Sequence, residues 1–114
     1  MSIFNKAKIL VIGDAMLDKY SFGSTNRISP EAPVPVLKIE RETLKPGGAA
    51  NVAANISSLG LNVSLLAEVG IDSNGKTLRA LLKSLKIDLI SGADKSYKTT
   101  TKTRVISQNQ QLIR

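Results

Sequence analysis

Carboxylate and amide side chains beside a pair of glycines are the groups in this sequence best suited to hold a ligand. Asp14 follows an apolar run, and Gly47, Gly48 and Asn51 open a later segment. A carboxylate accepts hydrogen bonds, an amide both donates and accepts them, and glycines let backbone N–H groups approach a ligand closely. Brought together by the fold, these groups would suit a polyhydroxylated ligand.

Chemistry that depends on cysteine or histidine is excluded, because the 114 residues contain neither. They offer no disulfide, no thiolate zinc site and no imidazole general base. Any acid–base step within this sequence would have to use Asp, Glu or Lys.

The first two aspartates are placed by a predicted strand. The apolar run from Lys8 to Asp14 is typical of a strand buried on both faces of a parallel sheet. Asp14 and Asp18 would then lie at or just beyond its carboxyl end, the edge where open α/β sheets bind ligands. A buried carboxylate is costly unless it is bonded, so we expect ligand hydroxyls to be partners of Asp14. The alternative is that Asp14 caps the following turn.

Prolines shape the next segment, residues 19–46. Pro30, Pro33 and Pro35 exclude a helix, and the alternation of polar and apolar residues from Val36 to Arg41 predicts a short, exposed strand. Prolines suit a strand at the edge of a sheet. We therefore predict an arm or flap between the first strand and the first helix.

The rest of the chain alternates between helix and strand patterns. Small apolar residues at helical spacing before Gly60, and later a leucine stripe opposite cationic residues, indicate two helices. The predicted helices are 46–60 and about 76–86, and the predicted strands are 63–70, 87–90 and 99–107. This alternation predicts an α/β fold. The sequence stops at Leu112–Arg114 without a turn or a cap, so we expect a truncated chain.

The net charge of +7 comes entirely from residues 76–114, which hold nine basic and two acidic residues. A basic half can bind nucleic acid, but here Tyr97 is its one aromatic residue and no basic run occurs. A solvated helix face explains most of the charge. A site for an anionic small molecule would need only two or three of these cations.

Hydropathy indicates a globular chain, with 42% hydrophobic residues and a mean hydropathy of +0.01. No apolar run approaches the ~18–20 residues of a membrane span, and the N-terminus is unlike a signal peptide. We expect a cytoplasmic protein that does not enter membranes.

Several segments together resemble the N-terminal signature of the ribokinase-like (PfkB) carbohydrate kinases. The matching segments are Val11–Asp14, Pro46–Ala53 with Gly60, and Val69–Gly75. Within this family, three further segments are similar to the heptose 7-phosphate kinases that are joined to an adenylyltransferase. These segments are Gly13–Tyr20, Arg27–Val36 and Gln108–Arg114.

The resemblance implies a kinase that uses ATP and Mg²⁺ to phosphorylate C1 of D-glycero-β-D-manno-heptose 7-phosphate. Its product would feed ADP-heptose synthesis for the lipopolysaccharide of Gram-negative bacteria. The implied fold is a central α/β sheet covered by helices, with a small β-lid that covers the sugar and builds a homodimer. The lid would map onto residues 19–46 and about 97–112. Strands with unpaired edges are a second reason to expect that dimer.

Some residue roles follow from the family signature itself. Asp14 would bind sugar hydroxyls, and Gly47, Gly48 and Asn51 would line the sugar.

Other roles belong to the heptose-kinase form of the motif. Asp18 and Arg27 would recognise the heptose, although Asp18 could instead cap a turn and Arg27 could form an ion pair within the lid. Lys102 and Arg104 are candidates for the 7-phosphate, because charge-assisted bonds to phosphate favour Lys and Arg. Lys102 could equally be a solvated cation.

The family's catalytic aspartate and anion hole lie in a Gly-x-Gly-Asp motif, which does not occur in these 114 residues. The family's ATP-binding residues are also missing, so no catalytic residue and no metal ligand is assigned. We therefore expect these residues alone to be inactive and the parent protein to be a kinase. The alternatives are a PfkB kinase for another sugar, or a non-catalytic module that binds sugar phosphate or dimerises.

Overall fold

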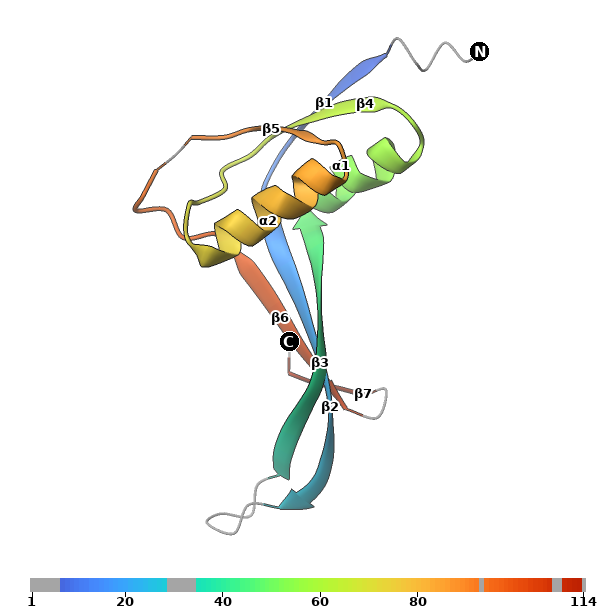
Figure 1. Ribbon diagram of the computed structural model, residues 1–114, viewed down its shortest axis with the longest axis vertical. Helices are drawn as coiled ribbons and strands as arrows, with labels where there is room; N and C mark the ends of the chain where they lie inside the picture. Colours follow the sequence, from blue (N-terminus) through green and yellow to red (C-terminus); the bar gives the residue numbers. More distant parts are fainter. Residues whose placement is uncertain (1–6, 29–34, 93, 108–109, 114) are drawn as a thin grey trace. The chain divides into compact units, whose positions relative to one another are not determined.

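The computed structural model describes residues 7–28, 35–92, 94–107 and 110–113, with side chains in 7–23, 41–92 and 94–106 (Figure 1). The chain divides into two compact units. The first comprises Met1–Leu17 and Lys45–Thr101, and the second Asp18–Leu44 and Lys102–Arg114. The elements, in chain order, are β1 (Lys8–Ile12), β2 (Ala15–Ile28), β3 (Pro35–Gly48), α1 (Ala49–Ser58), β4 (Asn62–Leu66), α2 (Ser73–Ser84), β5 (Asp88–Ile90), β6 (Thr101–Ser107) and β7 (Gln110–Ile113).

A parallel three-stranded sheet and two helices form the first unit. The strand order is β1-β4-β5, and each connection between neighbours contains a helix, the usual crossover between parallel strands. Right-handed crossovers place both helices on one face of such a sheet. Figure 1 shows α1 and α2 on the same side of these strands.

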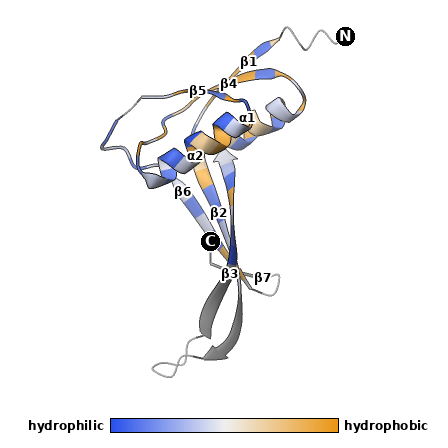
Figure 2. Ribbon diagram, in the orientation of Figure 1, coloured by the Kyte–Doolittle hydropathy of each residue, from blue (hydrophilic) through white to orange (hydrophobic). Residues whose placement is uncertain are grey.

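The core of this unit lies between the sheet and that helical layer. Ala50 and Ala53 of α1 are buried, and their small size lets the helix pack closely on the sheet. Leu65 of β4 and Leu78 and Leu82 of α2 are also buried. Hydrophobic and hydrophilic residues alternate along α2 with the turns of the helix (Figure 2), which is the pattern of a helix with one packed face.

The opposite face of the sheet is open, contrary to the expectation of strands buried on both faces. The exposed fractions are 52% for Leu10, 69% for Ile12, 40% for Leu66 and 48% for Ile90. The register aligns Ile12 with Leu66 and Leu66 with Ile90, so these side chains form one apolar row. The prediction was wrong for the described residues because both of their helices cover the same face.

Element boundaries differ from the sequence predictions at several ends. The first helix begins at Ala49, because residues 46–48 continue β3. It ends as predicted, with Gly60 at φ +86° and its N–H donating to the Ser57 carbonyl at 3.0 Å. The strand predicted over 63–70 ends at Leu66, and α2 already begins at Ser73.

The second unit contains most of a four-stranded sheet in the order β3-β2-β6-β7. The segment predicted as a flap contains two strands of 14 residues each, β2 and β3, rather than one short strand. Pro35 is the first residue of β3, and Pro46 also lies in β3, which is an edge of the sheet where proline is tolerated. Pro30 and Pro33 lie outside the described residues.

The position predicted for Asp18 was wrong: it lies inside β2 rather than at the end of β1.

Among the described residues, no helix has the length and apolar character needed to cross a membrane.

Candidate functional site

The turn after β1 and the start of α1 meet in the first unit. The backbone N–H of Ala49 donates to the carbonyl oxygen of Asp14 at 2.8 Å. Gly48 precedes the helix at φ +59°, and a Cβ there would collide with that same carbonyl oxygen. A Cβ at Gly13 would lie 3.1 Å from the Cβ of Ala49. This corner therefore requires glycine at position 48, both for its backbone conformation and for space.

The polar groups at this corner are open to a ligand. Asp14, Gly48 and Asn51 are exposed, whereas Gly47 is buried. Among the described residues, no side chain caps the N-terminus of α1, and no acidic residue lies in its first turn. A helix N-terminus favours acceptor groups, because its first N–H groups have no partner within the helix.

The Asp14 side chain is not buried, contrary to the sequence-based expectation. We expected a buried carboxylate that needs a partner, but the Asp14 side chain is exposed, so water satisfies it. Within the part of the chain that the structure describes, it makes no hydrogen bond and no ion pair, including none that would cap the next turn. Its carboxylate therefore remains available to a ligand.

The second unit brings another group of predicted residues onto one face of its sheet. Arg104 on β6 donates from Nη1 to the Tyr20 hydroxyl on β2 at 3.3 Å, and its guanidinium lies 5.6 Å from the Tyr20 ring centroid. Residues two apart on a strand share a face, so Asp18 accompanies Tyr20 and Lys102 accompanies Arg104. All four side chains are partly buried.

Two polar atoms on this face have unused hydrogen-bonding capacity. Asp18 Oδ1 and Arg104 Nε are buried, and neither has a hydrogen-bond partner among the described residues. Buried polar atoms nearly always have a partner. One of these atoms accepts and the other donates, so a ligand that carries both a hydroxyl and an anionic oxygen would satisfy both.

Positive charge dominates the same face. The guanidinium of Arg41 on β3 lies 4.2 Å from the ring centroid of Phe22 on β2. Phe22 is on the same face of β2 as Asp18 and Tyr20, so Arg41 lies on that face as well. On the opposite face, Ser21 donates to Glu42 at 3.4 Å. Arg41, Lys102 and Arg104 therefore share a face with Asp18, an arrangement that favours an anionic ligand.

The predicted residues thus fall into two groups, one in each unit. Asp14, Gly47, Gly48 and Asn51 belong to the first, and Asp18, Lys102 and Arg104 to the second. Arg27 lies in β2, but its side chain is outside the described residues. Sequence reasoning missed Tyr20, although its spacing of two from Asp18 within a strand could have indicated it.

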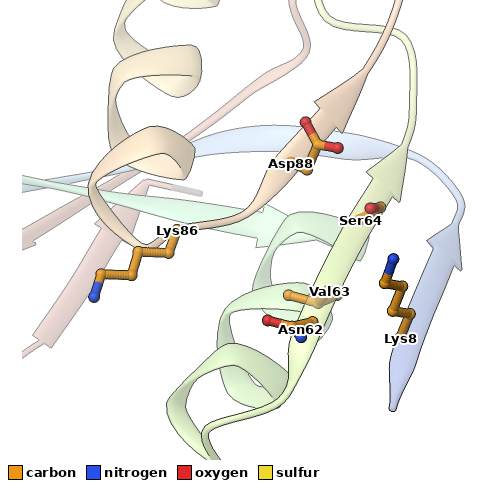
Figure 3. A pocket seen from close by; sticks show the side chains of 6 residues that line it. All are labelled: Lys8, Asn62, Val63, Ser64, Lys86 and Asp88. Carbon is orange, nitrogen blue, oxygen red and sulfur yellow. The ribbon is translucent and has the colours of Figure 1, made fainter. Parts of the chain in front are cut away.

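A hollow of about 260 Å³ lies at the other end of the first-unit sheet (Figure 3). It is lined by Lys8, Asn62, Val63, Ser64, Lys86 and Asp88. These residues belong to or precede the first residues of β1, β4 and β5, so they are at the edge opposite Asp14. Lys8 and Lys86 lie on opposite sides of β4, so their charges do not converge.

The resemblance places the residues that bind ATP and Mg²⁺ outside these 114 residues. Within the ranges that the structure covers, no group of three or more His, Cys, Asp or Glu side chains could hold a metal ion. We therefore assign no residue of this chain to ATP or Mg²⁺.

Comparison with protein families decides the relationship. The pfkB family of carbohydrate kinases matches residues 6–114. The chain belongs to this family.

Curated relatives in the pfkB family include proteins named "Bifunctional protein HldE". The protein from Haemophilus influenzae (strain PittEE) is 51% identical over 111 residues, which are 97% of this chain and 23% of the relative. The protein from Proteus mirabilis (strain HI4320) is 54% identical over 113 residues, with the same shares covered. The chain therefore spans about a quarter of the length of these relatives.

Solved structures confirm the predicted ribokinase-like α/β fold. A carbohydrate kinase from Agrobacterium tumefaciens superposes with a TM-score of 0.73 at 24% identity, over 93% of this chain and 34% of that chain. Phosphofructokinase-2 from Escherichia coli, in complex with fructose-6-phosphate, gives a TM-score of 0.68 at 23% identity, over 92% and 33%.

Proposed function

We propose that the protein to which these residues belong transfers the γ-phosphate of ATP to O1 of D-glycero-β-D-manno-heptose 7-phosphate. The bond from the γ-phosphorus to the β,γ-bridging oxygen breaks with ADP as the leaving group, a bond from that phosphorus to O1 forms, and the O1 proton passes to a base in the rest of the parent protein. The observation that carries this proposal is the identity of 51–54% to the HldE proteins across 97% of the chain. The implied place of this reaction is ADP-heptose synthesis in the cytoplasm.

The first-unit corner would hold the sugar. The exposed Asp14 carboxylate would accept hydrogen bonds from sugar hydroxyls, and Asn51 could both donate and accept. The Asp14 carbonyl oxygen approaches Gly48 so closely that no side chain fits there, so none would separate the start of α1 from the sugar. Gly47 is buried, so its role would be to shape the backbone beside the sugar.

The cationic face of the second unit would hold the 7-phosphate. Arg104 Nε is an unused donor, and Lys102 adds a second cation on the same face. Asp18 Oδ1 is an unused acceptor that would take a hydroxyl of the heptose. The side chains that bind ATP and Mg²⁺ and activate O1 would lie in the rest of the parent protein.

The test uses the full-length parent protein with ATP, Mg²⁺ and one sugar phosphate at a time. We expect ADP release with heptose 7-phosphate at a kcat/KM about a hundredfold above that with fructose 6-phosphate. The 114-residue chain alone should show no turnover. A preference for fructose 6-phosphate would indicate a kinase for another sugar. Calorimetric binding of heptose 7-phosphate without turnover by the parent would indicate a binding module.

We also propose a homodimer through the second unit. β3 and β7 are the edges of the four-stranded sheet, and unpaired edges tend to pair with another chain. The same element of a second copy would pair with such an edge under twofold symmetry. Sedimentation of the parent protein should give twice the mass of one chain. A single-chain mass at high concentration would contradict this proposal.

A further inference from the structure

Thr99 is held at a junction just before β6. It is 6% exposed and lies two residues before the strand begins at Thr101. Its hydroxyl donates to Asp72 Oδ1 at 2.6 Å and accepts from the Gly70 N–H at 2.9 Å. Its own N–H donates to Asp72 Oδ2 at 3.1 Å. The Thr99 hydroxyl therefore both donates and accepts a hydrogen bond within the first unit.

Asp72 serves two segments at once. Its Oδ1 also accepts from the Gly75 N–H at 2.9 Å, which makes Asp72 the N-cap of α2. The single carboxylate therefore links the first turn of α2 to the residue that leads into β6. A helix cap needs only one acceptor oxygen, whereas both oxygens of Asp72 are bonded to Thr99.

Glycines make this close packing possible. A Cβ at Gly75 would collide with the Gly70 carbonyl and lie 2.6 Å from Thr99 Oγ1. A Cβ at Gly70 would collide with the Tyr97 carbonyl and lie 3.0 Å from the same oxygen. Arg79 of α2 fixes the loop further, donating from Nη2 to the Val69 carbonyl at 2.7 Å and from Nε to the Gly70 carbonyl at 3.2 Å.

Thr100, the residue after Thr99, is hydrogen-bonded to β2. The carbonyl oxygen of Thr100 accepts from the N–H of Leu17 at 2.9 Å, and Leu17 is fully buried in β2. The segment before β6 is thus bonded both to the α2 loop and to the first part of β2. Lys102 and Arg104 follow within a few residues on the same strand.

We propose that Asp72 is a positioning residue for β6. Through Thr99 it fixes the point from which β6 carries Lys102 and Arg104, so sugar-phosphate binding depends on Asp72 although it touches no substrate. The part of this inference that concerns binding rests on the proposed function. The part that concerns the order of β6 does not.

Two variants of the parent protein separate this role from helix capping. Thr99→Val keeps the shape of residue 99 and the Asp72 cap but removes the hydroxyl that bonds Asp72. Asp72→Ser keeps an N-cap of similar quality but cannot bond Thr99 with two oxygens. The matched control is Asp94→Asn, because the Asp94 carboxylate accepts from the N–H and the hydroxyl of Ser96, within an exposed turn.

Hydrogen exchange is the first readout. Both variants should speed exchange of the β6 amides, 101–107, about tenfold, while α2 amides keep their wild-type rates. The control should change neither. If β6 exchange stays at the wild-type rate in Thr99→Val and Asp72→Ser, the proposal is wrong, whatever the enzymatic activity proves to be.

Kinetics are the second readout. The KM for heptose 7-phosphate should rise about tenfold in both variants, with kcat and the KM for ATP within about twofold of wild type. Faster β6 exchange with an unchanged sugar KM would overturn the link to binding. If the parent has no kinase activity, the proposed function fails and the exchange experiment still decides the role of Asp72.

Discussion

The N–H of Ala49 and the carbonyl oxygen of Asp14 form a 2.8 Å hydrogen bond that joins α1 to the turn after β1. The donor is one of the N-terminal N–H groups that have no partner within a helix. The bond therefore satisfies one of these N–H groups and holds Asp14, a candidate ligand-binding residue, beside the start of α1. The same close approach makes the preceding residue, Gly48, intolerant of a side chain.

Replacing this glycine should destabilise the parent protein more than replacing another glycine of similar backbone conformation. Gly60→Ala should cost about 1–2 kcal/mol, because φ is +86° but no described atom lies within 4 Å of the new Cβ. Gly48→Ala combines φ +59° with a collision between the new Cβ and the Asp14 carbonyl oxygen. It should therefore cost about 1–3 kcal/mol more than Gly60→Ala. Urea unfolding of both variants measures the difference. Equal losses would show that the corner can relax.

Asp14→Asn should weaken sugar binding without weakening the fold. The change keeps the shape but replaces an acceptor oxygen by a donor, and a bond between a charged group and a hydroxyl contributes about 1.5–3 kcal/mol. We expect the KM for heptose 7-phosphate to rise by one to two orders of magnitude, at ~1.4 kcal/mol per tenfold. The melting temperature and the KM for ATP should stay near wild type.

The matched control for this variant is Asp88→Asn. Asp88 is also exposed, but it begins β5 at the opposite edge of the same sheet. Its loss should leave the sugar KM unchanged. A lower melting temperature in Asp14→Asn with unchanged sugar kinetics would instead indicate a structural role for Asp14.

Local sequence signals predicted the α/β elements of the first unit well. The positive φ angles of Gly60 and of Gly48, just before α1, follow from the fact that glycine alone adopts such conformations readily. The prediction of α2 follows from the helical spacing of its leucines, which puts them on one face and the cationic residues on the other. These features depend on residues a few positions apart, so a single sequence contains the information.

Features that depend on distant residues could not be predicted. The Thr99–Asp72 bond joins positions 27 apart, and the Arg104–Tyr20 bond joins positions 84 apart. The length of β2 was also missed, because Ser21, Gly23 and Ser24 are typical of turns and pairing with neighbouring strands overrides that preference. The open sheet face was missed because an apolar run does not reveal which helices will cover it.

Arg104→Lys should impair recognition of the phosphate selectively. Lysine keeps the charge but loses Nε and the planar group beside Tyr20. We expect the KM for heptose 7-phosphate to rise about tenfold, since bonds to charged groups are the stronger ones. The KM for the unphosphorylated heptose should not change.

Lys83→Gln is the control for this variant, because Lys83 is an exposed cation on α2. It should leave both KM values unchanged. An equal rise for the phosphorylated and unphosphorylated sugars in Arg104→Lys would place Arg104 against the sugar rather than the phosphate.

The Asp72–Thr99 bond also predicts how stability depends on pH. The Thr99 hydroxyl is the main cause that holds the pKa of Asp72 below its ordinary value of 3.8, with backbone N–H bonds adding to it and desolvation opposing it. A carboxyl whose pKa is lowered in the folded state stabilises the fold above its unfolded pKa, and this contribution disappears as pH falls through the folded pKa. We therefore expect Thr99→Val to be less stable than wild type at neutral pH, with a gap that narrows below pH 3.8. The gap should not close fully, because the Gly70 N–H loses its acceptor at every pH.

The comparison is Ser96→Ala, which removes the hydroxyl that is the main cause of the lowered pKa of the exposed Asp94. That gap should be small throughout, since both groups are exposed in a local turn. Urea midpoints measured from neutral pH to below 3.8 test both expectations. A gap for Thr99→Val that is constant across this range would show that the hydroxyl does not stabilise the Asp72 carboxylate.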